Sequence, residues 1–209
     1  MTTPGPTRSR LRRLLPWLRW GTVALLVGLL LLDLLFPPPL PGKRGTSVVV
    51  AARDGSPLRA FADAEGVWRY PTTPEQVSPL YLQALLGYED RWFWRHPGIN
   101  PVAMLRAGTQ MLGNRRIVSG GSTLTMQVAR LVESESTRSA FGKLRQMVHA
   151  DQLEHQLSKD EILTLYLTLA PYGGNIEGVR AASLAYFGKE PKRLSIAESA
   201  LLVALPQSP

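Results

Sequence analysis

The chain has 209 residues, of which 44% are hydrophobic, and its 24 basic and 16 acidic side chains give a net charge of +8. This length suffices for one ordinary domain with an additional segment. The absence of cysteine excludes disulfide bonds, thiol catalysis and cysteine-ligated metal sites. Half of the net charge lies before residue 41, and no stripe of basic residues interleaved with aromatic residues follows it, so no nucleic-acid partner is expected.

An apolar segment near the N-terminus predicts a membrane anchor. Residues 14–36 are largely apolar apart from Arg19 and Asp33, and they reach the roughly 20 residues that a helix needs to cross a bilayer. No clean small-residue cleavage site follows, so a retained anchor is expected in preference to a cleaved signal peptide. Residues 1–13 form a basic tail, which predicts a single pass with the N-terminus in the cytoplasm.

A proline-rich spacer at residues 37–45 links the anchor to a predicted domain at residues 46–209. The domain begins with a small β-element, in which residues 47–52 and 67–70 are strand candidates. A turn is expected at residues 53–57. This element should lie beside the membrane.

Helical patterns follow from Pro74 onward and predict a mainly α domain. Two capping boxes, Ser158 with Glu161 and Ser195 with Glu198, each precede an apolar run and predict helix starts. Gly188 is expected at a helix C-terminus. Four further helices are expected, at residues 78–89, 100–111, from 122 onward and at 141–157. The first of them should turn four side chains toward the core: Leu82, Leu85, Leu86 and Tyr88.

Two adjacent carboxylates, Glu89 and Asp90, precede a cluster of aromatic residues in the stretch GYEDRWFWRHPGIN. Taken alone, this pattern is more typical of a helix end, with both acids in water and the aromatic rings in the core. The alternative is a catalytic carboxylate set against an apolar wall, where it acts as a base. The stretch by itself leaves both interpretations open.

A glycine pair precedes the next predicted helix in the stretch IVSGGSTLTMQVAR. The pair permits a tight turn, Ser122 is expected to cap the helix, and the N–H groups at the helix start favour an anion. Spacings of four and seven residues place Thr123, Gln127 and Arg130 on one face. An ordinary turn, cap and polar surface explain the stretch equally simply, and no Gly-Lys-Ser/Thr follows at the spacing of a P-loop.

A third polar stretch lies in the helix that follows. Lys143 and Gln146 share one face of this helix, as do Arg145 and His149. A basic helix face is usually just solvated, so the pattern alone does not establish a site. His149 and His155 are six residues apart, which is neither of the spacings that place two ligands on one turn, and a metal site is not expected there.

Together these stretches resemble the peptidoglycan glycosyltransferase family (glycosyltransferase family 51), the polymerase domain of class A penicillin-binding proteins. Glu89-Asp90, with Phe93 and His96-x-Gly98, is similar to the first signature of the family. Four segments in the expected order are similar to the other signatures: GGSTLTMQ, SKDEILTLYL, GVRAASLAYFGK and LSIAESALLVALPQSP. The segments EDRWFWRHPGIN, STLTMQVARL and KLRQ look most like the 1C subtype, and the chain resembles an N-terminal fragment of such a protein.

The resemblance implies a lysozyme-like, two-lobed domain that polymerises lipid II into glycan strands. It implies that Glu89 is the general base, which takes a proton from the 4-hydroxyl of the acceptor sugar. The growing chain then leaves undecaprenyl pyrophosphate with inversion. Substrate-binding roles are implied for nine residues: Asp90, Phe93, His96, Ser122, Thr123, Gln127, Arg130, Lys143 and Gln146.

The same resemblance implies a position at the bacterial inner membrane, with the catalytic domain in the periplasm. The implied partners are lipid II with the nascent glycan chain, inner-membrane lipids and other cell-wall synthesis proteins. A divalent cation at the pyrophosphate, Mg²⁺ or Mn²⁺, is the one cofactor that the resemblance suggests.

The chain departs from the third signature of the family, which usually carries an Arg-Lys pair and a second Glu. Those positions here are Gly142, Lys143 and Gln146. Glutamine can hydrogen-bond a phosphate but cannot take a proton. Asn100 replaces a common Asp, and Thr168 replaces a common Asn. Two alternatives to the polymerase stay open, a lytic glycosidase on the same scaffold and a non-catalytic scaffold protein that binds lipid II.

Overall fold

The computed structural model describes residues 19–25, 27–28, 31, 45, 47–54, 57–106, 121–133 and 140–207. The chain divides into two compact units, residues 1–37 and residues 38–209, which are described separately. In the first unit, residues 19–25 are helical. Within the described part of the chain, no helix combines the length and the apolar character needed to cross a membrane. The predicted basic tail, much of the predicted anchor and all of the spacer except Gly45 lie outside the described residues.

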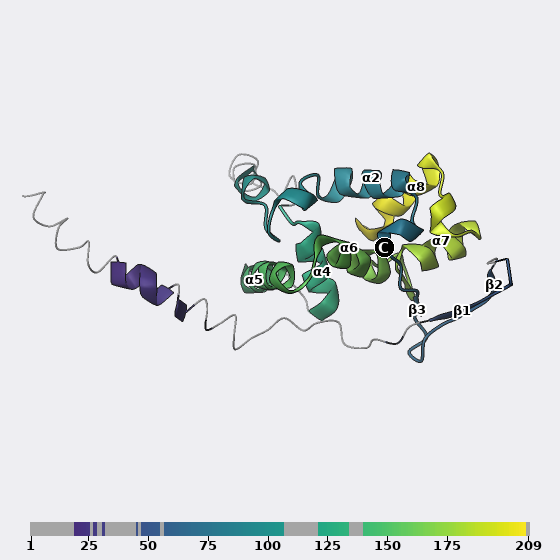
Figure 1. Cartoon of the computed structure of the whole chain (residues 1–209), viewed down its shortest axis with the longest axis horizontal. Helices are drawn as coiled ribbons and strands as arrows, with labels where there is room; N and C mark the ends of the chain where they lie inside the picture. Colours follow the sequence, from purple (N-terminus) through teal and green to yellow (C-terminus); the bar gives the residue numbers. More distant parts are fainter. Residues whose placement is uncertain are drawn as a thin grey trace, which may run out of the picture. The chain divides into compact units, whose positions relative to one another are not determined.

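Two small sheets form in the second unit (Figure 1). The first is antiparallel and joins β1 (Val48–Ala51) to β2 (Pro57–Phe61), with Val48 opposite Phe61. The second is parallel and joins β3 (Trp68–Arg69) to β4 (Ile176–Glu177). β1 and β3 confirm the two strand candidates. β2 and β4 were not predicted.

Helices dominate the second unit, which confirms the mainly α prediction (Figure 1). The α-helices of this unit include α2 (Pro79–Glu89), α4 (Leu124–Glu133), α5 (Ala140–Gln156), α6 (Lys159–Leu169), α7 (Val179–Phe187) and α8 (Ile196–Ala204). Short 3-10 helices are η1 (Pro74–Gln76), η2 (Phe93–Arg95), η3 (Pro191–Arg193) and η4 (Leu205–Gln207). Residues 101–106 are also helical, and the remainder of the helix predicted to reach residue 111 lies outside the described residues.

Both predicted capping boxes are present. The side chains of Ser158 and Ser195 accept hydrogen bonds from the N–H groups of Glu161 and Glu198, whose carboxylates bond back to the serines. These reciprocal bonds satisfy N–H groups that a helix start leaves open. Gly188 ends α7 with φ +64°, a left-handed conformation that glycine adopts without strain.

The start of α4 differs from the prediction by one residue. Thr123, and not Ser122, caps the helix, because the Thr123 hydroxyl accepts a hydrogen bond from the N–H of Met126. The hydroxyl of Ser122 instead receives a hydrogen bond from the ammonium group of Lys143. Ser122 is thus engaged with α5, and Thr123 supplies the cap of α4.

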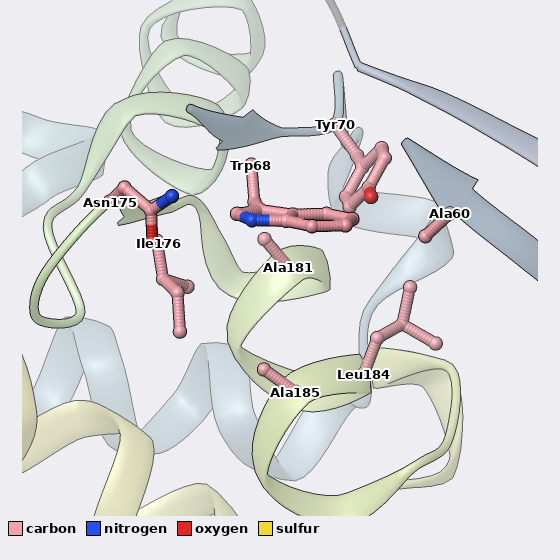
Figure 2. Close-up of a pocket in the computed structure, with 8 residues that line it drawn as sticks. All are labelled: Ala60, Trp68, Tyr70, Asn175, Ile176, Ala181, Leu184 and Ala185. Atoms are coloured by element: carbon pink, nitrogen blue, oxygen red, sulfur yellow. The ribbon is translucent and has the colours of Figure 1, made fainter. Parts of the chain in front are cut away.

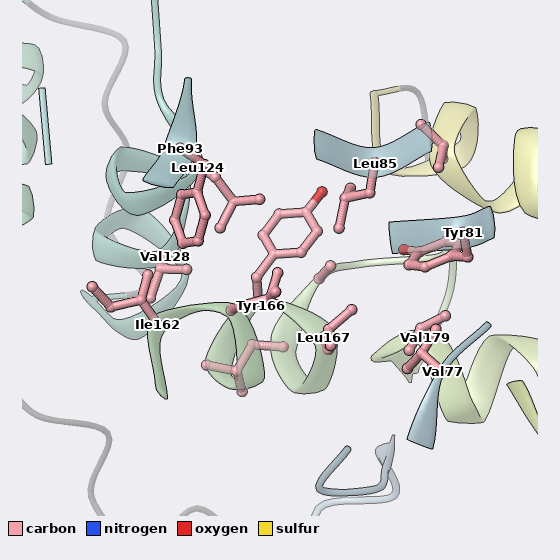
Figure 3. Close-up of a cluster of buried hydrophobic side chains, with 14 of the residues drawn as sticks. Val77, Tyr81, Leu85, Phe93, Leu124, Val128, Ile162, Tyr166, Leu167 and Val179 are labelled. Atoms are coloured by element: carbon pink, nitrogen blue, oxygen red, sulfur yellow. The ribbon is translucent and has the colours of Figure 1, made fainter. Parts of the chain in front are cut away.

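One hydrophobic core joins the helices of the second unit (Figure 3). α4 packs against α5 and α6, and α2 packs against α8. Figure 3 shows the ring of Tyr166 rising from α6 between Leu124 of α4 and Leu85 of α2. Since these side chains are almost fully buried, the core fixes the C-terminal end of α2 against the start of α4.

The buried aromatic residue of α2 is Tyr81, whereas Tyr88, which was predicted to be buried, is 66% exposed. The hydroxyl of Tyr81 lies 2.6 Å from that of Tyr172, and both side chains are buried. Burial raises the pKa of both phenols, so the pair stays neutral. The hydrophobic pattern of α2 does not reveal this pair because Tyr172 lies 91 residues away in the sequence.

Candidate functional site

Glu89 is the last residue of α2 and faces α4. Its side chain is half-buried, and its Oε2 accepts a hydrogen bond of 2.6 Å from Nε2 of Gln127. The amide of Gln127 is a neutral donor, and its hydrogen bond orients the carboxylate. The structure thus brings together two predicted site residues from different helices.

Lys143 lies near the start of α5 and reaches back to the start of α4. Its Nζ donates hydrogen bonds to Oγ of Ser122 at 2.5 Å and to Oε1 of Gln146 at 2.9 Å. Partial burial and the nearby positive charge of Arg130 lower the pKa of Lys143. Ammonium and guanidinium groups at one place form a surface suited to a phosphate-type anion.

Asp90 has very different surroundings from Glu89, its neighbour in the sequence. Asp90 is 6% exposed, and its carboxylate accepts hydrogen bonds from Nε2 of His96 at 2.9 and 3.0 Å and from the N–H of Leu124 at 2.9 Å. These bonds tie residues 90–98, here called the aromatic loop, to the first turn of α4. The interpretation of both acids as solvated is therefore wrong for Asp90.

The carboxylate of Asp90 also corrects the prediction of an open anion site at the start of α4. The N–H of Leu124 donates to Asp90, and the N–H of Met126 donates to the hydroxyl of Thr123. A helix N-terminus attracts a negative charge, and here the chain supplies that charge itself. A bound anion would thus meet the side chains around Lys143 and not these two backbone groups.

Phe93 belongs to the aromatic loop, and its side chain is fully buried. The ammonium group of Lys159 lies 4.5 Å from the centre of its ring. Lys159 also donates to the backbone oxygen of His96 at 2.7 Å and to Oε1 of Glu154 at 2.6 Å. Lys159 and Glu154 were not predicted as site residues, because no local pattern links them to a loop more than 50 residues away. Substrate contact by Phe93, His96 and Asp90 stays a prediction.

Thr123 holds the same loop from the side of α4. Its hydroxyl donates to the backbone oxygen of Gly98 and accepts from the N–H of Met126, and the side chain is 2% exposed. Gln127 is half-buried and Arg130 is exposed. The expected common polar face is therefore incomplete, because both hydrogen-bonding functions of the Thr123 hydroxyl are used inside the protein.

The close packing of this loop gives a stability prediction. Gly98 has φ +69°, and a Cβ atom there would lie 2.7 Å from the backbone oxygen of Ala150 in α5. We expect Gly98→Ala to lower the free energy of unfolding by roughly 3 kcal/mol, from left-handed strain together with a backbone clash. Gly188→Ala is the matched control, with φ +64° and no atom within 4 Å. Its expected loss is about 1 kcal/mol. Denaturant titration of both variants measures the difference, and equal losses would contradict the packing of the loop on α5.

The side chains described around Lys143 do not fit a divalent cation. They are an ammonium group, a hydroxyl, an amide and a guanidinium group, from Lys143, Ser122, Gln146 and Arg130. Mg²⁺ and Mn²⁺ prefer carboxylate, carbonyl and water oxygens. Among the residues that the structure describes, no three His, Cys, Asp or Glu side chains gather in a metal-binding arrangement.

A pocket of about 280 Å³ lies elsewhere, among β2, β3, β4 and α7 (Figure 2). Its lining is mostly apolar: Ala60, Trp68, Tyr70, Asn175, Ile176, Ala181, Leu184 and Ala185. Figure 2 shows the Trp68 ring lying across the pocket above Ala181. Since this lining contains neither a carboxylate nor a cationic side chain, the pocket does not offer the acid–base and anion-binding chemistry of the Glu89 and Lys143 region.

Comparison with known proteins relates this sequence to a family. A family model described as Transglycosylase matches residues 54–209, a range that includes Glu89 and Lys143. The chain is 55% identical over 195 residues to penicillin-binding protein 1C of Escherichia coli (strain K12), which covers 91% of the chain and 25% of that protein. It is 36% identical over 208 residues to penicillin-binding protein 1A of Pseudomonas aeruginosa, with 94% of the chain and 25% of that protein covered.

A more distant relative is penicillin-binding protein 2D of Bacillus subtilis (strain 168). It is 36% identical over 163 residues, which cover 78% of the chain and 23% of that protein. The chain thus spans about a quarter of the length of the curated relatives it matches. Because the transglycosylase match covers most of the chain, the chain belongs to the transglycosylase family.

Proposed function

We propose that this chain is a peptidoglycan glycosyltransferase that polymerises lipid II into glycan strands. One observation carries the proposal: a proton acceptor and a cationic group are held at the same end of α4. Gln127 holds Glu89, and Ser122, five residues earlier, holds the ammonium group of Lys143. Transfer of a sugar from a pyrophosphate to a hydroxyl group needs both a base and positive charge at the leaving group.

In the proposed reaction, Glu89 takes the proton of the 4-hydroxyl of the acceptor lipid II sugar. The oxygen attacks the anomeric carbon of the growing chain from the face opposite the leaving group. The bond from this carbon to the pyrophosphate oxygen breaks, the configuration inverts, and undecaprenyl pyrophosphate leaves as an anion. Lys143 and Arg130 stabilise the charge that develops on it. Gln127 keeps the base oriented through its hydrogen bond to Glu89.

In the proposed arrangement, the domain is lysozyme-like and two-lobed and lies in the periplasm. A single anchor, residues 14–36 of the chain, holds it at the inner membrane. The apolar segment and the arginine-rich tail before it support this topology. Lipid II, the nascent glycan chain and membrane lipids are then the expected partners. We expect a reporter fused after Pro209 to be active only in the periplasm. Reporter activity in the cytoplasm would contradict the orientation.

A polymerisation assay on the purified chain with lipid II tests the proposed activity. We expect glycan strands that lengthen with time in the presence of lipid II alone. Cleavage of preformed peptidoglycan without strand extension would indicate a lytic glycosidase. Binding of lipid II without turnover would indicate a scaffold protein. Either result would contradict the proposed function.

A further inference from the structure

Gln146 joins α5 to α4 through both ends of its side-chain amide. The residue is 3% exposed. Its Nε2 donates a hydrogen bond to the backbone oxygen of Met126, and its Oε1 accepts a hydrogen bond of 2.9 Å from Nζ of Lys143. Gln146 is thus fixed between the backbone of one helix and the ammonium group at the start of the other.

The two partners of Gln146 require opposite hydrogen-bonding functions. The backbone oxygen of Met126 needs a donor, and the ammonium group of Lys143 needs an acceptor. An amide supplies both, whereas an ionised carboxylate only accepts. A glutamate here would set a carboxylate oxygen against the oxygen of Met126, and an apolar side chain would leave both partners without this contact.

The amide also leaves the charge of Lys143 intact. Lysine has a flexible stem with many rotamers, so the position of its ammonium group depends on its hydrogen-bond partners. For Lys143 the described partners are the hydroxyl of Ser122 and the amide oxygen of Gln146, and the nearby charge is that of Arg130. A carboxylate in place of the amide would pair with the ammonium group and reduce its attraction for an anion.

We propose that Gln146 is a positioning residue, which holds the ammonium group of Lys143 at Ser122 and keeps its positive charge available to the pyrophosphate of a lipid-linked sugar donor. The identity of the anion, a pyrophosphate, rests on the proposed function. Gln146 acts only through Lys143, since its own two ends are bonded inside the protein. Replacement by glutamate, the closest change in shape, is thus expected to impair the site.

A first experiment needs no lipid substrate. Titration of the Lys143 ammonium group by NMR, in protein with ¹³C-labelled lysine and with Lys143→Arg for assignment, reports its pKa. Gln146→Glu should raise this pKa because a carboxylate favours the charged form, and Gln146→Met should lower it because an acceptor is lost. Gln156→Glu makes the same charge change at an exposed position of α5 and should leave the titration unchanged. An unchanged Lys143 titration in the Gln146 variants would overturn the proposal.

The second experiment measures lipid II polymerisation by the same proteins. Gln146→Met and Gln146→Glu should each lower kcat/KM by about tenfold to a hundredfold. In these variants the ammonium group of Lys143, which stabilises the leaving pyrophosphate, is misplaced or neutralised. Gln156→Glu should match the parent. Gln146→Met adds no charge and carries both measurements if Gln146→Glu does not fold. Parental rates in the Gln146 variants would overturn the inference. A parent protein without polymerase activity would instead contradict the proposed function, and the titration would still decide whether Gln146 positions Lys143.

Discussion

Replacement of Glu89 by Gln is expected to lower the rate of lipid II polymerisation by at least about 10²-fold, because general base catalysis typically contributes 10²- to 10⁴-fold. The amide has the size of the carboxylate and still offers an oxygen to Nε2 of Gln127. It cannot take the proton of the acceptor hydroxyl. The loss should therefore appear in turnover, with little change in lipid II affinity. Single-turnover rates and binding of a fluorescent lipid II analogue measure the two effects separately.

Glu65→Gln is the matched control for this substitution. Glu65 is exposed in the turn between β2 and β3, so the same change in charge and shape should leave the rate unaffected. If turnover of Glu89→Gln stays within about tenfold of the parent, the substitution raises the activation free energy by less than roughly 1.4 kcal/mol. That result would contradict the assignment of Glu89 as the base. An equal loss in Glu65→Gln would show that the effect is one of overall charge.

The helices of the second unit were predictable where their ends are set by neighbours in the sequence. The capping boxes at Ser158 and Ser195 and the glycine at position 188 act within a few residues, and the structure confirms all three. Lys143 and Gln146 share a helix face as their spacing predicts, and they contact each other directly. Local spacing sufficed for these features.

Contacts between distant segments explain what the sequence did not reveal. β3 pairs with β4, and the carboxylate of Glu177 also bonds Nε of Arg69, 108 residues away. β4 has only two residues, so it has no alternating pattern long enough to identify it as the partner of the predicted strand β3. The burial of Tyr81 likewise depends on a distant residue, Tyr172, which lies 91 residues away in the sequence. Local patterns cannot choose between Tyr81 and Tyr88 when the partner comes from another element.

The candidate site shows the same division. The motif placed Glu89 and Asp90 side by side, but only the fold separates their roles. Glu89 faces the half-buried amide of Gln127, whereas Asp90 binds His96 and the start of α4 in the interior. Adjacent residues at the end of a helix point in different directions, so one carboxylate stays accessible while the other holds the loop. In the first turn of α4, the N–H of Leu124 therefore donates to Asp90.

Replacement of Lys143 by Ala is expected to lower the polymerisation rate by more than about tenfold, equivalent to roughly 1.4 kcal/mol or more of transition-state stabilisation. The residue supplies an ammonium group that Ser122 and Gln146 hold at the start of α4. Since position 146 carries no carboxylate, Lys143 and Arg130 should bear most of the charge of the leaving pyrophosphate. Rates at saturating lipid II, compared between variant and parent, measure this loss.

Lys192→Ala is the control for the loss of a positive charge, because Lys192 lies on η3 and donates to the backbone oxygen of Glu75. Its rate should equal that of the parent. Added Mg²⁺ should have little effect on the parent, because the cationic side chains near Lys143 repel a divalent cation and the amide oxygen of Gln146 is already bonded. A strong Mg²⁺ requirement would show that other ligands hold a metal ion. If, in addition, Lys143→Ala kept the parental rate, the pyrophosphate would have to be stabilised away from the start of α4, and the proposed role of the Lys143–Gln146 contact would be wrong.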